Sequence, residues 1–275
     1  MDRVADQFIT LNSARFHYRD WENPDAPALI LLHGFARNAR MFDPFARAMQ
    51  TRFRVIALDL RGHGETDWAK NYSTEQSVED LEALRAALGL SRFNLFGHSM
   101  GGTVAYNYAA LHPDAVARLV IGDAAPETLG VGLSRIRAIV QMRETFDSLQ
   151  DAFEFASKMN PKGDEEAQRE RTHSNLMQRA DGKWTWRYDS ALRKPNPPIT
   201  RPDSKTQWEL LKRIQCPTLL IRGAQTDVLG CETAERMVRE IPNCRLVELP
   251  NSGHQVPFDE PEAFLQAVQG FLRQG

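Results

Sequence analysis

The chain has little of what marks disulfide-rich, membrane-spanning or nucleic-acid-binding proteins. Its three cysteines, Cys216, Cys231 and Cys244, are an odd number without the C-x-x-C spacing of common zinc sites. No stretch approaches the roughly 18 apolar residues of a membrane-spanning helix, and residues 1–20 lack the apolar core of a secretory signal. With 34 basic against 36 acidic residues, the net charge of -2 provides no basic field for nucleic acid. We therefore expect a cytoplasmic protein without membrane insertion, whose partner is a small molecule.

What the chain does have is a series of short apolar runs separated by helical patterns. Such alternation predicts an α/β fold with a mostly parallel sheet covered by helices on both faces. Residues 8–11 and 15–18 flank a turn and predict an antiparallel hairpin at one edge. Ser73 and Thr74 predict the start of a helix that Gly89 closes, and another helix is expected to begin near Pro261. The six apolar runs are residues 28–32, 55–58, 93–96, 119–121, 218–221 and 246–249.

The alternation stops between residues 124 and 205, where helical patterns and a proline-rich passage follow one another. This interruption predicts a helical cap inserted into a single core formed by residues 1–123 and 206–275. Trp184, Trp186 and Tyr188 alternate with a period of two, which predicts a short extended segment whose aromatic side chains pack against the core rather than form a platform for substrate.

Residues 97–101, Gly-His-Ser-Met-Gly, are the most informative motif of the chain. They follow an apolar run and precede a helical pattern, which is the arrangement of a nucleophile elbow. Gly97 and Gly101 are needed because a side chain at either position would collide with neighbouring backbone where strand meets helix. The motif predicts that the hydroxyl of Ser99 is exposed at the sheet edge and acts as a nucleophile.

A serine hydroxyl needs a base that a carboxylate orients, and in elbow-type sites the acid precedes the histidine in the chain. Asp227 follows the run 218–221, and His254 follows the run 246–249. Because the carboxyl ends of parallel strands meet at one edge of a sheet, these side chains are expected to converge on Ser99. We therefore predict His254 as the general base and Asp227 as the orienting acid.

The same chemistry needs N–H donors aimed at the oxyanion that develops during attack. One is the backbone N–H of Met100, which follows the nucleophile at the start of a helix. The other is expected in the loop after residues 28–32, which reads His-Gly-Phe-Ala, and we assign it to Phe35.

With these landmarks the chain resembles the capped serine hydrolases of the α/β-hydrolase superfamily. The matching segments are residues 33–35, 59–64, 97–102, 223–227 and 253–254. The resemblance implies an eight-stranded, mostly parallel sheet and a serine hydrolase that uses neither a metal nor an organic cofactor. It also leaves an alternative acid open, because Asp123 stands where some members of the superfamily place theirs.

We expect hydrolysis of a carboxylic ester or lactone of a small, largely apolar molecule, with esterase and lactonase activity equally open. The cap side chains Met142, Phe146, Phe153, Phe155 and Met159 either roof an apolar acyl pocket or pack within the cap. Alternatives are a ligand-binding or signalling protein with slow turnover, and carbon–carbon bond hydrolase or perhydrolase activity on the same residues. The sequence leaves open whether the protein is a monomer or a homodimer.

Overall fold

A computed structural model describes residues 4–132, 134, 143–159, 165–194 and 197–273. Its centre is an eight-stranded sheet in the order β1-β2-β4-β3-β6-β7-β12-β13. Neighbouring strands from β4 to β13 run parallel, while β1 pairs with β2 and β2 with β4 in the antiparallel sense. The strands are β1 (Val4–Leu11), β2 (Ala14–Trp21), β3 (Ala28–Leu32), β4 (Arg54–Leu58), β6 (Phe93–His98), β7 (Val116–Gly122), β12 (Thr218–Gly223) and β13 (Cys244–Leu249). The α/β prediction is confirmed.

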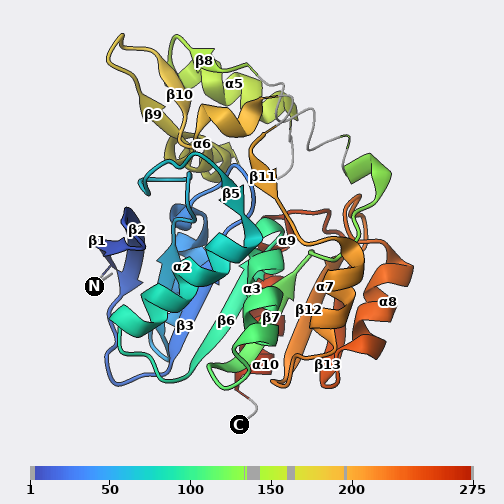
Figure 1. Cartoon of the computed structure of the whole chain (residues 1–275). Coiled ribbons are helices and arrows are strands. Elements are labelled where there is room, and N and C mark those ends of the chain that lie inside the picture. Colours follow the sequence, from blue (N-terminus) through green and yellow to red (C-terminus); the bar gives the residue numbers. More distant parts are fainter. Residues whose placement is uncertain (1–3, 133, 135–142, 160–164, 195–196, 274–275) are drawn as a thin grey trace.

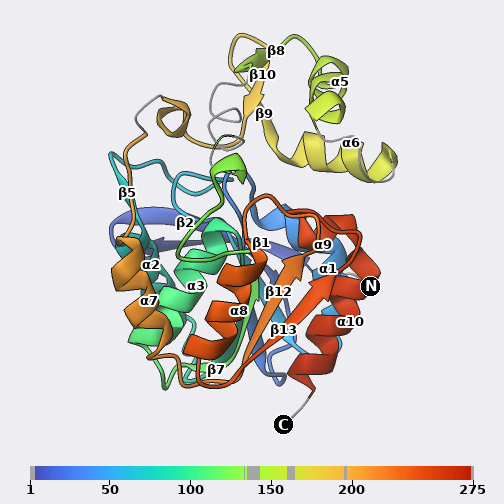
Figure 2. The ribbon, with the colours of Figure 1, turned by 90° about the vertical axis from the view of Figure 1, so that its right-hand side faces the viewer.

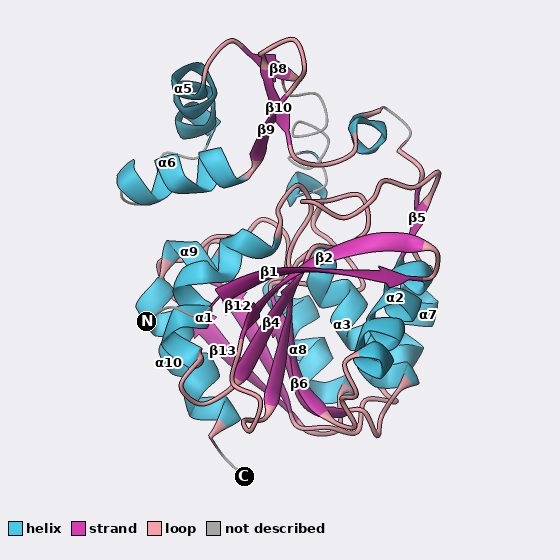
Figure 3. Cartoon of the chain, turned by 90° about the vertical axis from the view of Figure 1, so that its left-hand side faces the viewer, coloured by secondary structure: helices cyan, strands magenta, loops and turns pink. Residues whose placement is uncertain are grey.

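Helices cover both faces of this sheet (Figures 2 and 3). One face carries α2 (Thr74–Ala87), α3 (Met100–Leu111), α7 (Ser204–Leu211) and α8 (Cys231–Glu240), and the other carries α1 (Asp43–Met49) and α10 (Pro261–Leu272). Strand β3 explains the continuous apolar runs, because Leu29 and Leu31 pack into one core and Ile30 and Leu32 into the other. Among the described residues, no helix is long and apolar enough to cross a membrane.

Local sequence signals set several element boundaries. The hairpin loop consists of Asn12 and Ser13, both with positive φ, so it is one residue shorter than the expected three. Ser73 caps α2 as expected, since its Oγ accepts a hydrogen bond from the backbone N–H of Gln76 at 3.0 Å. Gly89 follows this helix with φ of 66°, a conformation that glycine adopts without strain.

The described residues from 143 to 200, which we call the cap segment, lie over the carboxyl ends of the core strands (Figure 1). This segment is not purely helical. It combines α5 (Leu149–Met159) and α6 (Glu165–Ser174) with a three-stranded antiparallel sheet in the order β8-β10-β9. Its strands are β8 (Thr145–Phe146), β9 (Leu176–Gln178) and β10 (Trp184–Trp186), so the extended segment expected at Trp184 and Trp186 is confirmed.

The cap segment is joined to the core by paired backbone and by side-chain hydrogen bonds. Strand β11 (Ile199–Thr200) runs parallel to β5 (Tyr72–Ser73) beside the start of α2. Tyr72 donates its hydroxyl proton to the carboxylate of Asp189 at 2.5 Å, and the Asn38 side chain donates to the carbonyl of Ser174 at 2.9 Å. The described residues also form two 3-10 turns (Ala39–Phe42 and Ser190–Arg193) and α9 (Val256–Asp259).

Candidate active site

Ser99 occupies the sharp turn between β6 and α3. Its φ of 53° and ψ of -117° are unfavourable for a residue with a side chain, so the surrounding backbone must hold the turn in place. A Cβ added at Gly97 would lie 2.1 Å from the carbonyl oxygen of Gly101, and one added at Gly101 would lie 2.3 Å from that of Leu32. Both glycines are therefore required by close backbone approach, as the sequence indicated.

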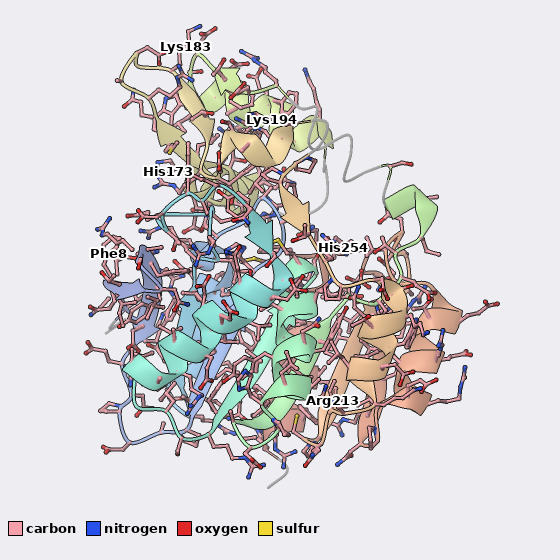
Figure 4. The ribbon with its side chains drawn as sticks, in the orientation of Figure 1. Phe8, His173, Lys183, Lys194, Arg213 and His254 are labelled. Atoms are coloured by element: carbon pink, nitrogen blue, oxygen red, sulfur yellow. The ribbon has the colours of Figure 1, made fainter. Side chains whose placement is uncertain are left out.

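The side chain of His254 reaches Ser99 from the loop after β13, the edge strand three positions along the sheet from β6. Its Nε2 lies 3.0 Å from the Oγ of Ser99, and its Nδ1 lies 2.6 Å from the Oδ2 of Asp123. With the proton on Nδ1, the ring donates to the carboxylate and presents a lone pair to the serine hydroxyl. Figure 4 places His254 where the core meets the cap segment.

The carboxylate on His254 is that of Asp123, the alternative, and not that of Asp227, the residue preferred from the sequence. Asp123 directly follows β7, the immediate neighbour of β6, and its φ of 46° turns the side chain at the strand end. Asp227 comes four positions after Gly223, the last residue of β12, which lies one strand further from β6. Asp227 lines the same pocket, but the Nδ1 contact to which we had assigned it belongs to Asp123.

The carboxyl of Asp123 is completely buried. Burial raises its pKa to about 7, although Thr226 and the backbone N–H of Gly223 donate hydrogen bonds that favour the ionised form. The Oγ1 of Thr226 lies 2.6 Å from Oδ2 of Asp123, which also contacts His254. The site therefore holds a buried carboxyl group whose pKa lies well above its usual range.

The loop after β3 lies directly against the turn that carries Ser99. A Cβ added at Gly34 would lie 3.2 Å from the Cβ of Ser99, so Phe35 is placed next to the nucleophile. Phe35 and Met100 both line the pocket above Ser99. In the described ranges, no backbone carbonyl accepts a hydrogen bond from either N–H, and Met100 begins α3, where the helix dipole favours negative charge.

These residues open into a pocket of about 490 Å³ between the core and the cap segment. Its core side carries Ser99, Asp123 and His254 together with Thr103 of α3 and Val228 after β12. The cap side mixes apolar and polar groups: Phe155, Thr172, Asn175, Trp186, Tyr188 and Ile199. The pocket therefore has the volume that small-molecule sites have, and it brings the core residues and the cap side chains into one site.

A model of the α/β hydrolase fold matches residues 27–261, which is most of the chain and includes the three side chains of this site. The chain belongs to the α/β-hydrolase family. It is 30% identical over 271 residues to a 3-hydroxybutyrate-oligomer hydrolase of Cupriavidus necator, covering 94% of this chain and 92% of the relative. It is also 30% identical over 257 residues to an sn-1-specific diacylglycerol lipase of Mus musculus, covering 90% and 81%.

A solved α/β hydrolase from Novosphingobium aromaticivorans superimposes over the full length of both chains, with a TM-score of 0.85 and 30% identity. As a hydrolase of this family, the protein places its elbow, its histidine and the loop of Phe35 on core elements. Among the described residues, no group of three histidine, cysteine or acidic side chains is arranged to bind a metal ion.

Two further histidines shape the hydrolase site without contacting Ser99. His98 donates its Nε2 proton to the carbonyl oxygen of His254 at 2.8 Å, and burial lowers its pKa to about 3, so it stays neutral. The Nδ1 of His33 donates to the carbonyl of Gly34 at 2.8 Å, and its Nε2 accepts the backbone N–H of Leu60 at 3.0 Å. Burial also lowers the pKa of His33. Both rings therefore hold backbone loops of the site in place.

The aromatic side chains expected in the cap divide between the pocket and the interior of the segment. Phe155 lines the pocket, while Phe146 is completely buried against Phe155 and Trp186. Trp186 and Tyr188 also line the pocket, which the interpretation as pure packing missed. Phe153 is buried but does not line the pocket. Met142 lies outside the described residues, as does the side chain of Met159.

Sequence reasoning missed three polar contributors. Thr226 donates to Asp123, and Arg37 and Arg201 line the pocket. Thr226 directly precedes Asp227 in a segment already singled out, so its hydroxyl could have been considered as a donor to the acid. No pattern in the sequence distinguishes Arg201 from other arginines of the chain.

Proposed function

We propose that the protein is a serine hydrolase that cleaves carboxylic esters or lactones of small molecules through an acyl-enzyme intermediate. The observation that carries the proposal is the continuous chain of contacts from Ser99 through His254 to Asp123, with distances of 3.0 and 2.6 Å. Nucleophile, base and orienting carboxylate are the groups that this chemistry requires, in the contacts that it requires.

In the first half of the reaction, Oγ of Ser99 attacks the carbonyl carbon while Nε2 of His254 takes the hydroxyl proton. Asp123 accepts the hydrogen bond from Nδ1 and stabilises the imidazolium that forms. The negative charge on the former carbonyl oxygen is stabilised by the backbone N–H groups of Phe35 and Met100. The intermediate collapses when the ester C–O bond breaks, and His254 donates its proton to the leaving alkoxide.

In the second half, a water molecule loses its proton to Nε2 of His254 and attacks the acyl carbon. The bond to Oγ of Ser99 breaks, and the histidine returns the proton to the serine. A lactone follows the same course, except that its alcohol remains attached to the acyl group and leaves with it as a hydroxy acid.

The choice of ester and lactone substrates is supported by the pocket and by the relatives. Apolar side chains such as Phe155 and Ile199 suit an acyl or alkyl group beside Ser99. The relatives reported above are named for hydrolysis of 3-hydroxybutyrate oligomers and as a diacylglycerol lipase. We extend only their common chemistry, ester hydrolysis, to this chain.

The test is a pH-stat measurement of acid release from ethyl esters and lactones of increasing chain length. Ser99→Ala is expected to lower kcat by about three to six orders of magnitude with the fold intact, because the acyl-enzyme can no longer form. Circular dichroism and thermal unfolding of the variant provide the control. Full activity of Ser99→Ala would contradict the proposal, and a wild-type protein that stops after a single turnover would indicate a slow receptor instead of an enzyme.

A further inference from the structure

Arg201 is a cation in the wall of the pocket without an acidic partner. It lies in the loop between β11 and α7 and lines the same pocket as Ser99 and His254. In the part of the chain that the structure describes, no carboxylate forms an ion pair with its guanidinium, and its one charge-related neighbour is the phenol of Tyr106. That phenol is neutral at ordinary pH, because burial raises its pKa.

Three partly buried arginines of the chain, by contrast, each pair with a carboxylate. Arg54 contacts Asp20 at 2.6 Å, Arg61 contacts Asp80 at 2.6 Å, and Arg193 contacts Glu144 at 2.8 Å. The side chain of Arg201 remains accessible from the pocket, yet the protein around it lowers the pKa of its guanidinium. An exposed guanidinium that lines the pocket and forms no ion pair among the described residues can bind an anionic ligand there.

Helix α3 relates Arg201 to the nucleophile. Thr103, which also lines the pocket, lies one turn after Ser99, and Tyr106 follows about one turn later. Each turn advances about 5.4 Å, so Tyr106, whose phenol interacts electrostatically with Arg201, lies about two turns along the helix from the reacting serine. This separation suits an anionic group a few bonds away from the scissile carbonyl.

We propose that Arg201 binds a free carboxylate of the substrate, so that short esters carrying a carboxylate are preferred to neutral esters of the same shape. This inference rests on the proposed ester hydrolysis and specifies its substrate class. A planar guanidinium matches a planar carboxylate with two parallel hydrogen bonds, and the pairing is strong where solvent is partly excluded. Arg37 and Arg171 line the pocket as well, but each has other interactions.

The test compares kcat/KM for two charged esters with that for neutral esters of matching shape. Monoethyl glutarate is paired with ethyl 5-methylhexanoate, and 4-acetoxybutanoate with 4-methylpentyl acetate, so that the carboxylate is placed on the acyl side or on the alcohol side. We expect the wild type to prefer the charged ester of at least one pair. Arg201→Gln should reduce that preference about 10- to 100-fold, mainly through KM, because the ion pair is present before and during the reaction.

Two further variants show whether a loss is specific. Arg201→Lys keeps the charge without the planar fork and should restore part of the preference. Arg213→Gln removes the same charge from the opposite end of the core (Figure 4) and should leave the preference at the wild-type value. Equal losses in Arg201→Gln and Arg213→Gln, or equal losses on charged and neutral esters, would overturn the assignment.

Binding to the Ser99→Ala protein separates this inference from the proposed function. Calorimetry should detect tighter binding of monoethyl glutarate or 4-acetoxybutanoate than of its neutral counterpart, and Arg201→Gln in the same background should abolish the difference. If neutral esters are hydrolysed but no carboxylate is preferred in turnover or binding, only the role of Arg201 fails. If inorganic phosphate competes better than glutarate at equal concentration, the carboxylate class is wrong.

Discussion

The two walls of the pocket differ in how they are built. On the core wall, Asp123 and His254 are almost fully buried and are joined by contacts of 2.6 to 3.0 Å at the ends of long, paired strands. On the cap wall, the strands are two or three residues long, and ion pairs such as Arg143 with Asp151 and Arg179 with Asp181 lie at the surface. Exposed pairs of this kind contribute little to stability.

This difference separates the two tasks of the site. The core wall fixes reacting groups in one arrangement, because every backbone element that carries them is part of the main sheet or packs on it. The cap wall encloses the substrate with side chains on short elements that a substitution can reshape locally. Changes in the core wall should therefore alter the rate on every substrate, whereas changes in the cap wall should alter which substrate is preferred.

The largest expected effect on rate is the difference between substitutions of the two aspartates. Asp123→Asn should lower kcat by about 10⁴-fold on every ester, because an amide at this position stabilises the wrong tautomer of His254 and cannot stabilise its charged form. Asp227→Asn changes a side chain of the same pocket and should cost less than about tenfold. Initial rates of both variants on one ethyl ester, with unfolding temperatures as the control for folding, provide the comparison. Equal losses, or a larger loss in Asp227→Asn, would restore Asp227 as the acid.

The next largest effect is expected in the pH dependence of kcat/KM. Because burial raises the pKa of Asp123 to about 7, this carboxyl takes up a proton as the pH falls through this range and can then no longer stabilise a charged imidazole. We expect kcat/KM to fall about tenfold per pH unit below pH 7. The same raised pKa means that protonation of Asp123 favours the folded state, so this contribution to stability is lost as the pH rises through about 7. A rate that stays constant down to pH 5 would contradict the assignment.

Substitutions of Thr226 test whether the pKa of Asp123 sets the acid limb of this rate profile. Its hydroxyl donates to the carboxylate at 2.6 Å and thereby lowers the pKa of Asp123. Thr226→Val removes the donor and should move the acid limb of the rate profile to higher pH, by about one unit. Thr226→Ser retains the hydroxyl and should leave the limb in place. If both variants shift the profile equally, the hydrogen bond is not responsible.

The smallest effect is expected in the cap wall, where two phenylalanines of α5 form a matched pair. Phe155→Ala enlarges the pocket and should raise the ratio of kcat/KM for ethyl octanoate over ethyl butanoate about tenfold. Phe153→Ala removes a buried ring of the same helix that does not line the pocket, so the ratio should stay near the wild-type value. A similar shift in both variants would mean that loosening of the cap segment, and not pocket volume, governs chain-length preference.

The contrast between the walls also accounts for what sequence reasoning could predict. The elbow at Ser99 is a local feature, because its strand, glycines and helix are contiguous in the chain. Asp123 and Asp227 both follow a strand and both satisfy the order of serine, acid and histidine. Which of them meets His254 depends on the placement of β7 directly beside β6, a property of the sheet that no short segment contains.

The cap segment was the harder part for a similar reason. Only β10 showed a period of two in the sequence, at Trp184 and Trp186, whereas β8 and β9 are too short to show one. Strand β8 pairs Thr145 with Thr185, forty positions away. The helical patterns were recognisable because α5 and α6 each span about three turns. Arg201 was not predicted because its significance lies in the missing partner, which is visible only once its neighbours in space are known.

The central claim, that the core wall makes Ser99 a nucleophile, is tested most directly by mass spectrometry after treatment with a fluorophosphonate. We expect complete loss of ester hydrolysis together with one covalent adduct per chain, located on the peptide that contains Ser99, and no adduct in Ser99→Ala. Modification should slow in Asp123→Asn and remain near the wild-type rate in Asp227→Asn. Inactivation with the adduct on another residue, or hydrolysis that continues when Ser99 is fully modified, would contradict the account.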